Sequence, residues 1–177
     1  MSSGAPDGLE IERVWVLREM PSATAAPLAT CERWEIEQGY LPETDAASQH
    51  DFPEGRIRRI TTGTGDVLCR HTVKRGTGLV REETEREITS AEFERLWPLT
   101  KGRRITKTRF RIRDGGFVWE LDRFHDLPLV MLEVELPNER VVPEMPTWTH
   151  GLVARDVTFD ARYRNAALAI VGLPNDA

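Results

Sequence analysis

The sequence predicts a mainly β (α+β) fold, in which eight short antiparallel strands are joined by tight turns and flanked by a few short helices. Most of the chain consists of short stretches of alternating polar and apolar residues, separated by Gly, Pro, Asp and Asn. Such alternation is typical of strands that bury one face, and such separators are typical of turns. The 177 residues suit a single domain spanning 1–177, since no internal repeat or linker divides them.

Each expected strand alternates and is bounded by turn residues. The strand ranges are Leu9–Leu17, Glu32–Tyr40, Gly55–Thr61, Val67–Lys74, Leu79–Ile88, Arg103–Arg113, Phe117–Phe124 and Val130–Leu136. Tight turns are expected where glycine tolerates the positive φ that such turns require. These turns are Thr62–Asp66, Arg75–Gly78 and Asp114–Gly116. Two further segments, rich in Ala, Pro, Ser and Asp, are interpreted as loops: Glu19–Thr30 and Thr44–Pro53.

Two short helices are expected to pack against the sheet. The first follows Thr89, which precedes Glu92 by three residues in the spacing of a capping box. Pro98 ends this helix, because proline cannot continue the backbone hydrogen-bond pattern. The second helix begins near Asp160 and ends before Pro174.

One face of the predicted sheet carries charged side chains on strand after strand, because alternate residues of a strand share a face. Acidic residues gather on the first and last strands, at Glu10, Glu12, Glu133 and Glu135. Basic residues gather on strands between them, at Arg70, Lys74, Lys107, Arg109, Arg111 and Arg113. A solvated face explains any single strand. The sorting by sign favours bound counter-ions, because like charges two residues apart on one face repel.

The sorted charges suggest a ligand that carries both metal ions and phosphates. Carboxylates are hard oxygen ligands suited to Mg²⁺ or Mn²⁺, and Arg and Lys bind phosphate. If the sheet closes, the charged face lines a lumen, and a barrel of about eight strands has room for one small ligand. A metal–polyphosphate complex would then satisfy both walls. The alternative is an open, solvated sheet without a ligand, in which Glu10 and Glu133 lie far apart.

The composition narrows the choice of partners and location. The net charge of −5 provides no general positive field to hold nucleic acid or an anionic membrane. Cys31 and Cys69 have no ligand cluster near them and are expected to be ordinary reduced cysteines. The N-terminal residues lack the apolar core of a signal peptide, and no run approaches the roughly 20 apolar residues needed to span a bilayer. We therefore expect a cytoplasmic protein.

The same residues resemble the signature motifs of the CYTH domain family, also called triphosphate tunnel metalloenzymes. Glu10-Ile11-Glu12 resembles the start of the ExExK signature that opens these domains. Further segments are similar to the family's QGYL, RxR, RxExE, KxR and ExE motifs, in that order: Gln38–Leu41, Arg56–Arg58, Arg81–Glu85, Lys107–Arg109 and Glu133–Glu135. Each fragment is weak by itself, but their order and spacing along the chain resemble the short bacterial tripolyphosphatase-like members.

This resemblance implies a closed tunnel of eight antiparallel strands with a charged lumen that holds Mg²⁺ or Mn²⁺ and a triphosphate. It implies metal ligands at Glu10, Glu12, Asp122, Glu133 and Glu135, with Glu83 and Glu85 in support. It implies phosphate contacts at Arg56, Arg58, Lys74, Arg81, Lys107 and Arg109. Catalytic roles fall to Glu10, Glu12 and Lys74. The alternative for each residue is an ion pair inside the lumen that never touches a ligand.

One position departs from the family pattern, because the lysine of ExExK is replaced by Val14. In the family this lysine helps to bind phosphate and to position the attacking water. Losing a charge-assisted contact to a developing phosphoryl charge costs orders of magnitude in rate. The expected function is metal-dependent hydrolysis of inorganic tripolyphosphate or another triphosphate, attenuated if nothing replaces the lysine. The alternative is a non-catalytic module that binds polyphosphate or a nucleotide.

Overall fold

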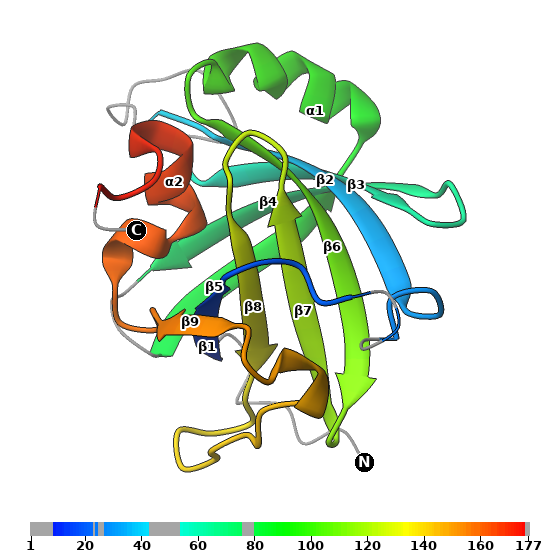
Figure 1. Cartoon of the computed structure of the whole chain (residues 1–177). Coiled ribbons are helices and arrows are strands. Elements are labelled where there is room, and N and C mark those ends of the chain that lie inside the picture. The colour runs from blue at the N-terminus through cyan, green and yellow to red at the C-terminus, as the bar shows by residue number, and fades with distance from the viewer. Residues whose placement is uncertain (1–8, 23, 25–26, 43–53, 76–79, 176–177) are drawn as a thin grey trace.

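The computed structural model describes residues 9–22, 24, 27–42, 54–75 and 80–175 (Figure 1). For residues 9, 10, 74, 75 and 80–82 it describes the strand pairing and not the side chains. Within these ranges one antiparallel sheet contains β1 (Leu9–Leu17), β2 (Glu32–Tyr40), β3 (Arg56–Thr62), β4 (Val67–Arg75), β5 (Val80–Ile88), β6 (Arg104–Asp114), β7 (Phe117–Phe124), β8 (Val130–Glu135) and β9 (Val153–Asp156). The short helices are α1 (Ser90–Leu96), η1 (Trp97–Thr100), η2 (Thr147–Thr149), η3 (Ala161–Tyr163) and α2 (Asn165–Val171).

The strands follow the order β5-β4-β3-β2-β6-β7-β8-β1-β9 across the sheet. In addition, β1 pairs with β5, the strand at the far end of this order, through the register Leu9↔Glu82, Glu10↔Arg81 and Ile11↔Val80. The predicted mainly β class with a few short helices is confirmed. Within the described residues the sheet has nine strands instead of the eight predicted, because β9, at four residues, is too short to show an alternating pattern.

The apolar faces of β1, β6, β7 and β8 form the larger core. Trp15, Ile112, Trp119 and Leu132 are buried in it, and Trp148 of η2 packs over them. The described part of the segment predicted as a loop at Glu19–Thr30 crosses this face (Figure 1), where its Met20 and Leu28 pack against the same core. The other predicted loop, Thr44–Pro53, lies outside the described residues. The outward face of these strands is therefore covered, and their other face is left to form the site.

The first predicted helix forms with the expected cap. The hydroxyl of Thr89 accepts a hydrogen bond from the Glu92 amide (3.1 Å), and the Thr89 amide donates to the Glu92 carboxylate (2.7 Å). α1 buries Phe93 and Leu96 against apolar side chains of β3 and β4, including Ile57. The capping-box prediction is thus confirmed. α1 covers the outer face of β3 and β4, and the core that contains Trp119 is a separate cluster on β1, β6, β7 and β8.

The second predicted helix is divided. Asp160 caps the short η3, where its carboxylate accepts from the Arg162 amide, and α2 begins only at Asn165. Gly172, with φ of 86°, ends α2, because glycine tolerates this backbone conformation. Tyr163 of η3 and Leu168 of α2 pack onto an apolar cluster that includes Val14, Ile105, Phe124 and Met131. Across the described residues, we find no helix that has both the length and the apolar character to cross a membrane.

Candidate active site

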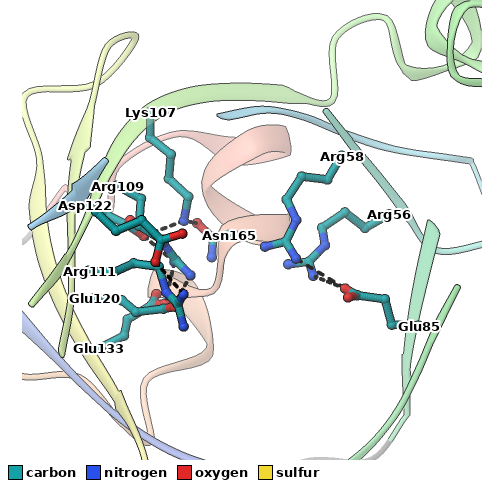
Figure 2. Close-up of polar contacts among 11 residues, drawn as sticks. Arg56, Arg58, Glu85, Lys107, Arg109, Arg111, Glu120, Asp122, Glu133 and Asn165 are labelled. Atoms are coloured by element: carbon teal, nitrogen blue, oxygen red, sulfur yellow. Dashed lines mark hydrogen bonds and ion pairs between the residues drawn. The ribbon is translucent and has the colours of Figure 1, made fainter. Parts of the chain in front are cut away.

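The inward-facing side chains of the sheet line a cavity of about 900 Å³. They come from both walls, and most of those that the sequence placed on the charged face contribute to it. The lining includes Glu12, Arg56, Arg58, Arg70, Thr72, Glu83, Glu85, Arg109, Arg111, Glu120, Glu133 and Glu135. Figure 2 shows two groups of these charges that face one another, one from β6–β8 with Asn165 of α2 and the other from β3 and β5.

The first group is a buried ion-pair network built around Asp122, which is fully buried on β7. Arg109, its direct partner in the register of β6 and β7, donates from Nε to Oδ1 (2.7 Å) and from Nη2 to Oδ2 (2.6 Å). The Lys107 ammonium, 1% exposed, forms an ion pair with Asp122 Oδ2 and donates to Asn165 Oδ1 (3.3 Å). Both oxygens of Asp122 therefore accept from cations.

Arg109 extends this network toward the cavity. Its Nη2 also donates to Glu133 Oε2 (2.8 Å), its Nη1 pairs with Glu120, and Arg111 Nε donates to the other Glu120 oxygen (3.2 Å). Burial lowers the pKa of Arg109, but the carboxylates of Asp122, Glu120 and Glu133 outweigh burial and raise this pKa well above its usual value. Burial likewise raises the pKa of Asp122, and Arg109 and Lys107 more than reverse the effect. Arg109 and Asp122 are therefore held in their ionised forms, whereas burial, with the neighbouring charge of Arg109, lowers the pKa of Lys107.

The second group, which we call the arginine cluster, consists of Arg56, Arg58 and Arg70 around the single carboxylate of Glu85. Arg58 Nη2 donates to Glu85 Oε2 (3.2 Å), and Arg56 Nη2 lies 3.9 Å from the same oxygen. Arg70 Nη1 pairs with Glu85 Oε1, and Thr72 Oγ1 donates to Oε2 (2.9 Å). Three guanidinium groups thus share one carboxylate, and the cluster carries surplus positive charge.

Two donors in the arginine cluster lack acceptors. Among the described residues, Arg56 Nε and Arg58 Nε are buried and have no hydrogen-bond partner. Burial, with the neighbouring charges of Arg56 and Arg109, lowers the pKa of Arg58 to about 10. A buried polar group without a partner is costly, and guanidinium groups bind phosphate through paired, charge-assisted hydrogen bonds. The cluster is therefore suited to an anion with several oxygen atoms.

Carboxylates face one another at the acidic side of the cavity. Glu12 of β1 lies directly opposite Glu135 of β8, and Glu120 of β7 lies directly opposite Glu133. Like charges in such cross-strand pairs are destabilising without a counter-ion, and Arg109 supplies one to Glu120 and Glu133. Within the residues that the structure describes, no group of three or more His, Cys, Asp or Glu side chains is arranged to hold a metal by itself. Mg²⁺ commonly uses only one or two carboxylates together with substrate phosphates, and this donor set fits that mode.

The structure separates the predicted site residues into three sets. Glu12, Arg56, Arg58, Glu83, Glu85, Arg109, Glu133 and Glu135 line the cavity. Lys107 and Asp122 bind each other behind the lining instead of facing the cavity. Glu10, Lys74 and Arg81 occupy β1, β4 and β5, but their side chains lie outside the described residues. Sequence reasoning did not select Arg70, Arg111 or Glu120, although the alternation of each strand places all three on the charged face.

Val14 is buried in the apolar cluster beneath η3 and α2, with Phe124, Met131 and Tyr163. Its Cα partner on β8 is Glu133, the residue that a lysine at this position would reach first. Glu133 already accepts from Arg109 (2.8 Å), so the missing lysine does not leave this carboxylate without a cation. Val14 therefore lines the cavity with an apolar side chain that also packs beneath η3 and α2.

We expect Val14→Lys to lower the free energy of unfolding by about 2 kcal/mol and not to increase turnover, because its ammonium would be desolvated beside Tyr163. Urea unfolding and phosphate release measure these two effects. Val14→Met, which adds length without charge, is the matched control. A Val14→Lys protein as stable as Val14→Met, with faster turnover, would show that the lysine is what this chain lacks.

The fold and the site thus define a β protein with an internal, charge-sorted cavity suited to a polyanion. No family model matches the sequence. The inorganic triphosphatase of Nitrosomonas europaea is 37% identical over 158 residues, which cover 77% of this chain and 97% of that protein. The inorganic triphosphatase of Acetivibrio thermocellus is 41% identical over 95 residues, covering 52% of this chain and 58% of that protein.

Solved structures agree with these relatives. The crystal structure of the inorganic triphosphatase NE1496 aligns with a TM-score of 0.53 at 31% identity, over 91% of this chain and 94% of that one. The PH1012 protein from Pyrococcus horikoshii OT3 shares the fold, with a TM-score of 0.53 at 18% identity over 74% and 80% of the two chains. The chain belongs to the CYTH, or triphosphate tunnel, family.

Proposed function

We propose that this protein, as one domain, hydrolyses inorganic tripolyphosphate or another triphosphate with Mg²⁺ or Mn²⁺, inside a tunnel closed by the pairing of β1 with β5. The observation that carries the proposal is the arginine cluster, in which three guanidinium groups share one carboxylate and two buried Nε donors lack acceptors. The cavity of about 900 Å³ supports it, as does the inorganic triphosphatase that matches 77% of this chain.

In this proposal the arginine cluster binds the phosphate oxygens. Bound triphosphate competes with Glu85 for Arg56, Arg58 and Arg70, and it supplies acceptors to the two buried Nε donors. Since Arg58 stays protonated well above neutral pH, the cluster remains cationic in ordinary buffers. The triphosphate is thereby held on the wall opposite the carboxylates and oriented toward them.

One or two of the carboxylates Glu12, Glu133 and Glu135 would hold the metal together with phosphate oxygens of the substrate, and Glu10, whose side chain lies outside the described residues, is a further proposed ligand. A bound divalent cation would neutralise phosphate oxygens and lower the pKa of a bound water. Arg109 holds the Glu133 carboxylate in place from behind, through the bond of 2.8 Å. Because Asp122 is fully occupied by Lys107 and Arg109, we assign it to positioning Arg109 rather than to the metal. Lys74 and Arg81 complete the proposed phosphate contacts from β4 and β5.

The test is phosphate release from tripolyphosphate with Mg²⁺, with Mn²⁺ and with EDTA. We expect turnover only with a metal, and a loss of about 100-fold or more in Glu135→Gln, which removes a charge that faces Glu12 across the strands. Glu139→Gln is the matched control, because Glu139 is exposed and does not line the cavity. Tight binding of tripolyphosphate in calorimetry without any turnover would refute the hydrolase and establish the non-catalytic binding module.

A further inference from the structure

A row of donor side chains continues from the arginine cluster across neighbouring strands, to the last residue of β2 and the residue that precedes β6. Tyr40 of β2 is the Cα partner of Arg56, and Arg56 is the partner of Thr72. On the other side of Tyr40, the backbone amide of Tyr40 donates to the Arg103 carbonyl (3.0 Å), which sets Arg103 beside it just before β6. All four residues line the cavity. The register thus aligns guanidinium, phenol, guanidinium and hydroxyl groups across neighbouring strands.

Arg103 is the free cation of this row. Across the described part of the chain, its guanidinium makes no hydrogen bond or ion pair, although Arg103 is half-buried. The next residue, Arg104, shows what a structural arginine does here: it donates to Thr100 Oγ1 (2.9 Å) and to the Trp97 carbonyl (2.5 Å) and lies over the Trp97 ring. The side chains of these two adjacent arginines therefore have different roles. Arg104 stabilises the fold through its contacts with Thr100 and Trp97, whereas Arg103 lines the cavity and is available to a ligand.

Tyr40 is held in the row by a residue behind it. The Gln38 side chain is fully buried, and its amide donates to the Tyr40 hydroxyl oxygen (2.8 Å). This bond fixes the position of the phenol beside Arg56 and Arg103. A phenol and a guanidinium held side by side are donors to phosphate oxygens, and neighbouring strands space such donors about 4.8 Å apart.

We propose that Arg103, with Tyr40 beside it, forms a subsite for a phosphate group beyond the three of a triphosphate, so that the cavity accepts longer linear polyphosphates. This inference rests on the proposed function. A linear polyphosphate presents anionic oxygens at every unit, which matches a row of donors that continues past Arg56. The nucleoside of a nucleotide would leave the Arg103 guanidinium without an anion.

The experiment compares tripolyphosphate, linear tetrapolyphosphate and ATP on the natural protein and on Arg103→Met. For Arg103→Met we expect the KM for tetrapolyphosphate to rise about tenfold, with the values for tripolyphosphate and ATP within twofold of the natural protein. Arg113→Met is the matched control, because Arg113 is an exposed arginine at the other end of β6 and does not line the cavity. Equal losses on all three substrates, a loss on ATP alone, or no change on any of them would overturn the subsite.

Calorimetry in EDTA separates this inference from the proposed function. The Kd of tetrapolyphosphate should rise about tenfold in Arg103→Met relative to the natural protein, while the Kd of tripolyphosphate stays unchanged. That result without any turnover would leave the subsite standing and remove the hydrolase. The opposite result is turnover of tripolyphosphate together with an equal change in the two Kd values, for tripolyphosphate and for tetrapolyphosphate, on going from the natural protein to Arg103→Met. It would support the hydrolase and refute the subsite.

Discussion

Arg109→Met is expected to destabilise the protein by about 3–5 kcal/mol, because it removes one cation from a buried network and leaves the carboxylates behind. Asp122 would lose two of its bonds, and Glu133 and Glu120 would each lose their contact with Arg109. The cost is the exposure of unpaired negative charge to a low-dielectric interior, which Lys107 alone cannot balance. Urea unfolding without metal or phosphate measures the change.

Arg113→Met serves as the control for this prediction also, since Arg113 lies on the same strand and is exposed. We expect that variant to stay within about 0.5 kcal/mol of the natural protein. If Arg109→Met does not fold, Arg109→Lys supplies the measurement, because it keeps the charge and loses the paired hydrogen bonds, and its stability should lie between the two. An Arg109→Met protein as stable as Arg113→Met would show that the network does not stabilise the fold.

Arg58→Met is expected to lower kcat/KM for tripolyphosphate by about 100-fold and to change stability by less than about 1 kcal/mol. Arg58 is buried almost as deeply as Arg109, with 9% of the residue exposed against 6%. It belongs, however, to a cluster with surplus positive charge, where burial and neighbouring arginines lower its pKa to about 10. Glu85 would keep Arg56 and Arg70 after the change. Removing Arg58 therefore relieves repulsion while it deletes a phosphate donor.

The control for Arg58 is its neighbour Arg59, which points to the outer face and binds Glu37 (2.7 Å) and Glu94 (2.5 Å). Arg59→Met should leave turnover unchanged and cost some stability. Of these two consecutive arginines, Arg58 would then be needed for turnover and Arg59 for stability. Unchanged binding of tripolyphosphate by Arg58→Met, or destabilisation as large as that of Arg109→Met, would contradict the assignment of the arginine cluster to phosphate.

The strands and the charged face could be predicted from the sequence because both depend on local alternation. The eight predicted strands all form, and their observed ends lie within one residue of the expected positions where these are described. The pattern also placed Arg70 and Arg111 on the charged face, although neither was chosen as a site residue. Alternation along a strand predicts which face of the sheet a side chain occupies. It does not predict which side chain of another strand lies next to it.

The pairing of charges could not be predicted, because it depends on the register between strands far apart in the sequence. Lys107 and Asp122 were expected to contact phosphate and metal, and the structure joins them to each other through strands whose register sets Arg109 opposite Asp122. Val14 is a similar case. Its loss of charge was visible in the sequence, but only the packing of Tyr163 and the bond from Arg109 to Glu133 show what the position does instead.

The sequence by itself therefore determined the class of fold, the inward sorting of acids and bases, and the resemblance to triphosphate tunnel proteins, since these follow from residue order and a period of two. The tertiary structure decided which of those charges balance one another and which remain available. That division depends on distance in space: three arginines converge on Glu85, whereas Arg109 is surrounded by three carboxylates. Charge balance in the cavity depends on side chains from several strands, so it cannot be worked out from any one strand.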